Sequence, residues 1–231
     1  MYYIGIIGRN NDDKVTFNNE VIDVIHKYHC IPIGIIANFN NNPNIEFNKI
    51  KKIIDLCDGF ILQGGDNYYD VDILIAKYLY KNNIPTLGIC LGMQTMAVAF
   101  NGNMNKINNH NSKNKYVHQI TINKNSKLYD IIKKNKIYVN SRHNSYVLNT
   151  NLNISASDEI IEAVEDKNKN FFIGVQWHPE SLMDENSILL FNNFFYSLNI
   201  KKIVNWKSKF QFHNMKLKCK RNVYNKGVFW Y

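Results

Sequence analysis

The chain has 231 residues, of which 45% are hydrophobic, and this suffices for one sizeable globular core. The formal net charge of +9 is concentrated at one end, because residues 201–231 carry nine Lys and Arg but no Asp or Glu. The other 19 cations balance the 19 acids, so the body of the chain is formally neutral and argues against a nucleic-acid or membrane partner. No stretch approaches the ~20 consecutive apolar residues of a membrane helix.

The four cysteines, Cys30, Cys57, Cys90 and Cys219, lie far apart, without a C-x-x-C pair or a nearby histidine at zinc spacing. This pattern indicates neither a disulfide framework nor a metal site, and it fits a reducing compartment. The N-terminus lacks a cationic stretch followed by a long apolar run, as a secretory signal would have. We therefore expect a cytoplasmic protein.

In the first hundred residues, short β-branched runs alternate with segments in which apolar residues recur at helical spacing. The expected strands are 3–8, 31–36, 59–62 and 85–89, and the helices that follow them are 19–29, 47–57, 71–82 and 92–100. Such alternation implies parallel strands joined by right-handed crossovers, hence an α/β sheet with helices on both faces. Active sites of such sheets gather at the carboxyl ends of the strands.

After Asn101 the sequence becomes β-rich, which predicts a mixed sheet or a β-extension. The expected strands are 116–122, 137–139, 154–156, 160–165 and 171–176, and a packed helix at 187–198 closes the domain. We predict a catalytic domain over residues 1–200 and a basic, aromatic C-terminal extension over residues 201–231. That extension suits single-stranded nucleic acid, an anionic surface or a partner groove, but we favour one that buries its aromatic side chains on the domain.

The strongest motif is Leu-Gly-Ile-Cys-Leu-Gly-Met-Gln at residues 87–94, where a buried strand stops at Cys90 and a helix begins at once. A sharp strand-to-helix turn of this kind strains the backbone, exposes the side chain to a cleft and requires small neighbours such as Gly88 and Gly92. Free N–H groups at a helix N-terminus favour a thiolate and can hold an oxyanion. We predict Cys90 as a nucleophile and the Leu91 N–H as an oxyanion donor.

Two further elements complete the predicted site. Gly64 and Gly65 end the preceding strand, and a turn without side chains lets the Gly65 N–H approach the same oxyanion. His178 and Glu180 follow the strand 171–176, and this pair provides a general base and the carboxylate that orients it. Each residue alone is more often structural, but together they favour a catalytic triad of Cys90, His178 and Glu180.

These motifs resemble those of the class I glutamine amidotransferases, which carry a G-x-C-x-G-x-Q elbow and a downstream H-P-E. The resemblance spans residues 3–199 and implies a flavodoxin-like α/β core, no metal or cofactor, and a γ-glutamyl thioester intermediate. It also implies that Gln94 holds the α-amino or α-carboxylate end of the glutamyl group. The segment 139–146 resembles the lining of the glutamyl pocket, with His143, Ser145 and Tyr146 at matching positions and Gly64 beside them. Asn144 departs from the family by replacing a second histidine, and Leu91 by replacing an arginine, so the leaving-group side is expected to differ.

Three functions follow as alternatives. The Gly-Gly-Asp start at residues 64–66 favours the γ-glutamyl hydrolase (peptidase C26) branch, and the size also resembles γ-glutamyl-CDP-amidate hydrolases of capsule biosynthesis. In that case Arg9, Arg142 or Lys106 would meet phosphates near the cleft mouth. The second alternative is a glutaminase subunit that passes ammonia to a separate synthetase subunit. The third is a catalytically silent metabolite-binding protein, against which the intact triad argues.

Overall fold

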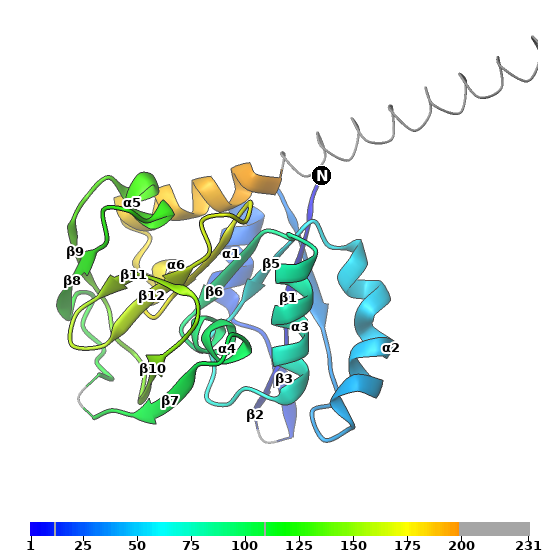
Figure 1. Ribbon diagram of the computed structural model, residues 1–231. Coiled ribbons are helices and arrows are strands. Elements are labelled where there is room, and N and C mark those ends of the chain that lie inside the picture. Colours follow the sequence, from blue (N-terminus) through cyan, green and yellow to red (C-terminus); the bar gives the residue numbers. More distant parts are fainter. Residues whose placement is uncertain (12, 109, 199–231) are drawn as a thin grey trace, which may run out of the picture.

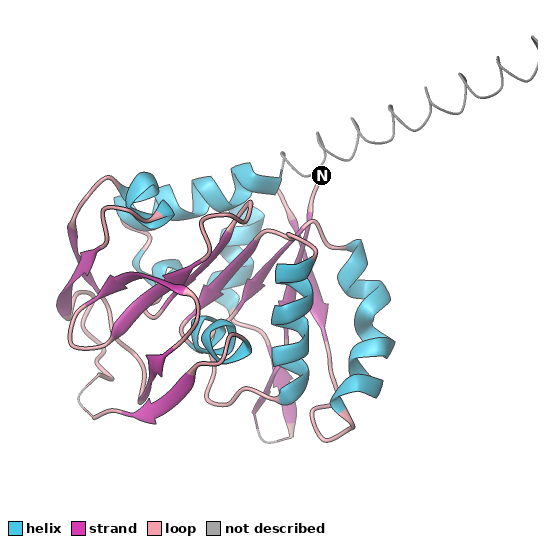
Figure 2. Cartoon of the chain, viewed as in Figure 1, coloured by secondary structure: helices cyan, strands magenta, loops and turns pink. Residues whose placement is uncertain are grey.

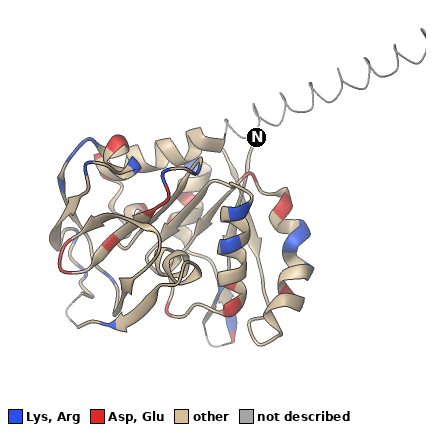
Figure 3. Ribbon diagram, in the orientation of Figure 1, with Lys and Arg blue, Asp and Glu red and all other residues tan. Residues whose placement is uncertain are grey.

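The computed structural model describes residues 1–11, 13–108 and 110–198, and its ribbon is shown in Figure 1. The predicted extension 201–231 lies outside the described residues, so its role and the boundary at residue 200 stay predictions. Within the described ranges, no helix combines the length and the apolar character that crossing a bilayer requires. Both charge signs occur along the outer helices α2 (Pro43–Leu56) and α3 (Asp70–Lys81) (Figure 3).

A nine-stranded sheet forms the centre of the fold, in the order β4-β1-β5-β6-β13-β12-β11-β8-β9. The five parallel strands are β1 (Tyr3–Ile7), β4 (Ile31–Ile35), β5 (Gly59–Leu62), β6 (Thr86–Ile89) and β13 (Phe172–Val175). Four antiparallel strands extend the sheet from β13, namely β12 (Ile161–Glu165), β11 (Asn153–Ser157), β8 (His118–Ile122) and β9 (Lys136–Val139). The predicted parallel core with a β-rich addition is confirmed.

Helices cover both faces of the sheet (Figure 2). One core packs α1 (Asn19–Lys27), α5 (Lys127–Ile132) and the helical residues 185–198 against the sheet, and the other packs α2, α3 and α4 (Leu91–Ala99). Neighbouring residues of β5 point into different cores, Ile61 into the first and Phe60 into the second. This alternation explains why the parallel strands are continuous apolar runs, since a strand buried on both faces has no polar side.

The structure departs from the predicted elements at several places. The helix expected at 47–57 begins at Pro43, because the Asn42 side chain accepts hydrogen bonds from the N–H groups of Asn44 and Ile45. Two separate two-stranded antiparallel sheets were not predicted, because their strands are short and mostly polar. They are β2 (Arg9–Asn11) with β3 (Lys14–Thr16), and β7 (Asn103–Lys106) with β10 (Ser145–Asn149). The short helices α5 and α6 (Pro179–Leu182) were also missed.

Candidate active site

Three neighbouring strands, β5, β6 and β13, run parallel and end at the same edge of the sheet. Gly64, Cys90 and His178 follow these three strand ends in the chain. A Cβ atom placed on Gly64 would lie 3.1 Å from Cε1 of His178 and 3.7 Å from Cβ of Cys90. The structure therefore brings the predicted elbow, the Gly-Gly turn and the histidine motif into one place.

Cys90 occupies a strained turn between β6 and α4. Its backbone torsions, φ 52° and ψ −107°, lie outside the regions that L-residues favour. The helix that starts at Leu91 packs so closely on β5 that a Cβ atom on Gly92 would lie 1.9 Å from the carbonyl oxygen of Leu62. Glycine is thus required at position 92, and the tight turn holds the Cys90 side chain at the N-terminus of α4.

His178 and Glu180 form a hydrogen-bonded pair, in which Nδ1 of the ring lies 2.7 Å from Oε1 of the carboxylate. The Glu180 side chain is fully buried and also accepts a hydrogen bond of 3.4 Å from Nδ2 of Asn18. With Nδ1 engaged in this way, Nε2 is the ring atom that remains for Cys90. Nε2 has no partner of ordinary hydrogen-bond geometry, yet it is close enough to the thiol for Cys90 to affect its proton.

The pKa of His178 depends on this environment. Burial lowers the pKa, but the nearby Cys90 thiol, the hydrogen bond to Glu180 and the negative charges of both groups outweigh burial and raise it from 6.5 to about 10. At neutral pH the ring is therefore a cation between two groups that can each be anionic. A thiolate beside an imidazolium is the arrangement that cysteine-nucleophile enzymes use to activate sulfur.

The predicted oxyanion donors, Gly65 and Leu91, lie against each other beside Cys90. A Cβ atom on Gly65 would lie 3.1 Å from Cδ2 of Leu91, so the segment after β5 contacts the first residue of α4. Gly65 and Cys90 also line the same pocket. The placement suits two backbone N–H groups that converge on one oxygen, and this role stays a prediction.

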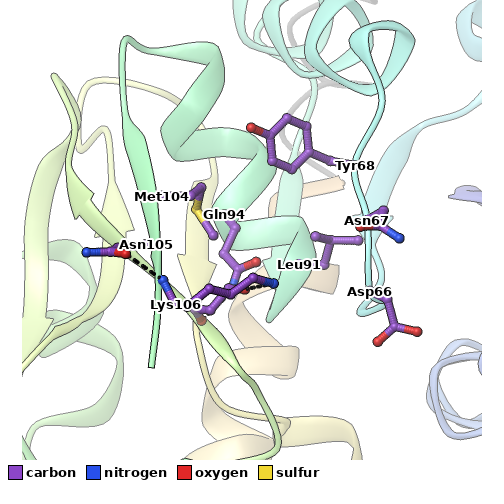
Figure 4. Close-up of a pocket in the computed structure, with 9 residues that line it drawn as sticks. Asp66, Asn67, Tyr68, Leu91, Gln94, Met104, Asn105 and Lys106 are labelled. Atoms are coloured by element: carbon purple, nitrogen blue, oxygen red, sulfur yellow. Dashed lines mark hydrogen bonds between the residues drawn. The ribbon is translucent and has the colours of Figure 1, made fainter. Parts of the chain in front are cut away.

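The site opens into two adjoining pockets, an inner one of about 180 Å³ that reaches Cys90 and an outer one of about 460 Å³. Both are lined by side chains from the loop after β5, from α4, from β7 and from β10. The residues common to the two pockets are Asp66, Asn67, Gln94, Lys106 and Ser145. Figure 4 shows the outer pocket, with Tyr68 and Asn67 on one side, Met104 and Lys106 on the other, and Gln94 between them.

Gln94 is 3% exposed and lines both pockets, as the resemblance implies. Its Nε2 donates one hydrogen bond of 2.9 Å to the carbonyl oxygen of Ser145 and another of 3.1 Å to Oε1 of Gln176. An amide nitrogen has two protons, so both are used within the protein. Oε1 of Gln94 is therefore the atom that can meet a substrate.

Of the other residues expected at the glutamyl end, some line the pockets and others do not. Ser145 lines both pockets and His143 lines the inner one, whereas Tyr146 lines neither. Arg142 and Lys106 line the inner pocket, as expected for cations near the cleft mouth. The expectation for Arg9 is wrong, because its guanidinium is buried and forms an ion pair of 2.7 Å with Asp72, which lies 63 residues further along the chain.

At the wall of the inner pocket, His143 belongs to a buried polar cluster. Its Nδ1 lies 3.0 Å from the carbonyl oxygen of Ser145, and its Nε2 lies 3.1 Å from Oγ of Ser141. Burial, with repulsion from His110 as the next cause, lowers the pKa of His143 from 6.5 to about 4. The ring is therefore neutral at neutral pH. Because a carbonyl oxygen can only accept, the proton of this neutral ring is on Nδ1.

The same cluster contains the one group of residues in the described ranges that has metal-ligand spacing: His110, His143 and Glu162, whose ligand atoms lie within 4.8 Å of one another. Hydrogen bonds already engage several of these atoms. Oε1 of Glu162 lies 3.1 Å from Nε2 of His118, and Oγ of Ser141 lies 3.5 Å from Nδ1 of His110. We interpret the group as a polar network that supports the pocket wall.

Three supporting residues had no role in the sequence prediction: Asn18, Asn140 and Gln176. Asn18 caps α1 and contacts Glu180, and no sequence signal connects residues 162 positions apart. Asn140 bonds both backbone groups of His178, and Gln176 contacts the Cys90 sulfur. Both of these residues stand within segments that the motifs marked, so their positions were visible but their partners were not.

The sequence profile of the peptidase C26 family matches residues 69–180. A glutamine amidotransferase-like protein of Rickettsia prowazekii is 30% identical over 211 residues, which cover 59% of this chain and 75% of that protein. The chain belongs to the class I glutamine amidotransferase family.

A larger synthetase and a solved glutaminase domain extend the comparison of this amidotransferase-family chain. The CTP synthase of Hydrogenobaculum sp. is 27% identical over 220 residues, which cover 77% of this chain and 40% of that enzyme. Among solved structures, the CTPS glutaminase domain of Trypanosoma brucei with bound acivicin matches with a TM-score of 0.67 at 22% identity, covering 85% of this chain and 94% of that chain. This likeness shows the shared fold, and the predicted class I amidotransferase fold is thereby confirmed.

Proposed function

We propose that this protein hydrolyses a γ-glutamyl amide bond, with Cys90 as nucleophile, His178 as general acid and base, and Glu180 as the carboxylate that orients the histidine. The observation that carries the proposal is the contact of 2.7 Å between His178 and Glu180, placed beside a cysteine that is held in a strained elbow. A buried carboxylate on one ring nitrogen and a thiol near the other are the arrangement of a cysteine-dependent acyl transferase.

The reaction has two balanced halves. The Cys90 thiolate forms a C–S bond with the amide carbon, and the N–H groups of Gly65 and Leu91 hold the resulting oxyanion. His178 gives its Nε2 proton to the leaving nitrogen as the C–N bond breaks, which leaves a γ-glutamyl thioester and an amine or amidate. Water then attacks the thioester, His178 takes up the proton of that water, and the thiolate leaves as glutamate forms.

The hydrogen bonds of Gln94 bear on which end of the glutamyl group binds beside it. Since both of its N–H bonds are engaged by Ser145 and Gln176, it presents only an acceptor oxygen to the pocket. An acceptor binds the α-ammonium group and not the α-carboxylate. We therefore place the ammonium beside Gln94 and the carboxylate beside the cations of the inner pocket, Lys106 and Arg142.

The lining of the inner pocket also bears on the leaving group. It carries two cations, Lys106 and Arg142, against one carboxylate, Asp66. One cation suffices for the glutamyl α-carboxylate, and the other favours an anionic leaving group, of which a phosphate-bearing amidate such as that in γ-glutamyl-CDP-amidate is the specific candidate. The alternative is a glutaminase subunit that supplies ammonia to a separate synthetase, and the likeness to the CTPS glutaminase domain supports it.

The deciding experiment measures glutamate release by the purified chain alone. The substrates are free glutamine, neutral γ-glutamyl amides, and γ-glutamyl-CDP-amidate. Preference for the phosphate-bearing amide supports the hydrolase, and preference for free glutamine supports the glutaminase. Cys90→Ala should abolish release, whereas Cys30→Ala, which alters a buried cysteine outside the pockets, should retain it. Release that persists in Cys90→Ala would overturn the proposed mechanism.

A further inference from the structure

A chain of side-chain hydrogen bonds leads from the pocket wall to the Cys90 sulfur, and its direction is fixed by one atom. The carbonyl oxygen of Ser145 can only accept, so the Gln94 group that faces it at 2.9 Å must be the NH₂ group. The same NH₂ group lies 3.1 Å from the Gln176 amide, which must therefore present its oxygen. The NH₂ group of Gln176 is thus directed at Sγ of Cys90, at 3.6 Å.

Gln176 has little freedom to reverse this arrangement. The residue is 0% exposed, and its backbone N–H donates a hydrogen bond of 2.8 Å to the carbonyl oxygen of Glu162 on the neighbouring strand. Rotation of its amide by 180° would oppose its NH₂ group to that of Gln94 and its oxygen to the sulfur. A buried donor that is locked in this way is preorganised for an anion.

We propose that Gln176 is a further catalytic residue, whose side-chain N–H donates a hydrogen bond to the Cys90 thiolate. The proposal rests on the proposed function, because it deepens the role of the same sulfur. The donor is neutral, so it stabilises the thiolate without a proton that could be lost to the leaving group. It has a second effect in the reaction, since a stabilised thiolate leaves more readily when the thioester is hydrolysed.

The donor's contribution is expected to be large because both partners are buried, with Gln176 0% and Cys90 5% exposed. A hydrogen bond to a charged group is stronger than one between neutral groups, and exclusion of water strengthens it further. His178 is the other proton donor near the sulfur, but its ring changes charge during the proposed cycle. Gln176 is therefore the constant donor of the pair, present in the free enzyme, in the thioester and in both transition states.

The test is the pH dependence of Cys90 alkylation by iodoacetamide, with the site of alkylation read by peptide mass spectrometry. Alkylation needs no turnover, so failure of this proposal can be told apart from failure of the proposed function. Gln176→Met keeps the length of the side chain and removes the donor. The pH at half-maximal rate should rise by about one unit, so the rate below that pH falls about tenfold while the high-pH plateau is retained.

Two matched variants sharpen the result. Gln176→Glu places a carboxylate beside the thiolate and should shift the profile further in the same direction. Gln119→Met changes an exposed glutamine of β8 and should leave the profile at its wild-type position. A Gln176→Met profile that superimposes on that of the wild-type protein would overturn the proposal.

The wild-type protein offers a measurement that does not depend on a variant folding. The chain has five glutamines, Gln63, Gln94, Gln119, Gln176 and Gln211, so isotope labelling of glutamine alone leaves few enough side-chain amide NMR signals to resolve. One NH₂ proton of Gln176 should move strongly when Cys90 is alkylated, because the charged acceptor is then lost. An unchanged Gln176 signal, with alkylation complete, would contradict a hydrogen bond to the thiolate.

Discussion

The side chain of Asn140 bonds both backbone groups of His178: its Oδ1 accepts from the His178 N–H at 2.8 Å, and its Nδ2 donates to the His178 carbonyl oxygen at 3.1 Å. Asn140 directly follows β9, at the far antiparallel edge of the sheet, whereas His178 follows β13 in the parallel core. The clamp therefore ties the β-rich addition to the backbone that carries the histidine. It explains how the antiparallel edge of the sheet bears on the site.

We predict that Asn140→Ala lowers kcat for γ-glutamyl amide hydrolysis by about tenfold, because the His178 backbone loses both partners and the ring loses its fixed position. The free energy of unfolding should fall by about 1–3 kcal/mol, the cost of unpaired backbone groups in a partly buried place. Steady-state kinetics and urea unfolding measure the two effects. Asn135→Ala, at an exposed position before β9, is the control and should change neither.

Substitution of Gly92 should affect stability, whereas substitution of Gly64 should affect catalysis. Gly92→Ala should cost about 3 kcal/mol or more of stability or prevent folding, because its Cβ would lie 1.9 Å from the Leu62 carbonyl oxygen, a backbone atom. Gly64→Ala should fold, since its nearest contact is 3.1 Å from Cε1 of His178, but kcat should fall by about tenfold as the ring is displaced. Thermal unfolding and kinetics on both variants test this. A Gly64→Ala variant with wild-type kcat would contradict the placement of His178.

The pH profile reports the charge on His178. Its pKa of about 10 implies that the ring keeps the proton needed by the leaving nitrogen throughout the neutral range, and that the alkaline limb of kcat/KM lies near pH 10. Because the folded-state pKa exceeds the unfolded value of 6.5, the stability that this proton contributes is complete below pH 6.5 and is lost as the pH rises through 10.

Glu180→Gln tests the source of that pKa. Without the Glu180 charge, only Cys90 opposes the effect of burial, so the pKa of His178 should fall. The alkaline limb of kcat/KM should then move toward neutral pH, and kcat should fall about a hundredfold. Glu185→Gln removes an exposed carboxylate from the helical residues 185–198 and should leave the profile unchanged. An alkaline limb that stays in place in Glu180→Gln would argue against the pair.

The sequence was sufficient for the candidate catalytic residues, whose signals are contiguous motifs. Cys90 with its flanking glycines, and His178 with Glu180, are contiguous motifs at the ends of apolar strands, and parallel strands end at one edge by geometry. The start of α2 also has a local signal, because Asn42 is the N-cap and Pro43 is the first helical residue. The prediction used apolar periodicity alone and therefore placed the start of this helix too late.

Sequence reasoning failed where a partner lies far along the chain. Arg9 was expected at the cleft mouth because its charge is visible in the sequence, whereas its pairing with Asp72 depends on how β2 and α3 are placed relative to each other. Gln176 stood inside a motif without a role, since its contact with Cys90 spans 86 residues and requires β6 and β13 to be neighbours. Side-chain networks across a sheet need the strand order, which the residue pattern does not specify.

His143 makes the stability of the protein sensitive to acid. Its folded-state pKa of about 4 lies below the unfolded value of 6.5. Between these pH values His143 is therefore protonated in the unfolded chain but not in the folded chain. Stability from this group is therefore present above pH 6.5 and is lost as the pH falls toward 4, by up to about 3 kcal/mol. His143→Asn keeps an N–H that can reach the Ser145 carbonyl oxygen but cannot titrate. Urea unfolding at pH 7 and pH 4.5 should therefore show a smaller loss of stability in acid.

His29→Asn, at an exposed position where φ 55° suits asparagine, should lose as much stability in acid as the wild-type protein. Equal acid losses in wild type and His143→Asn would assign the sensitivity to another group.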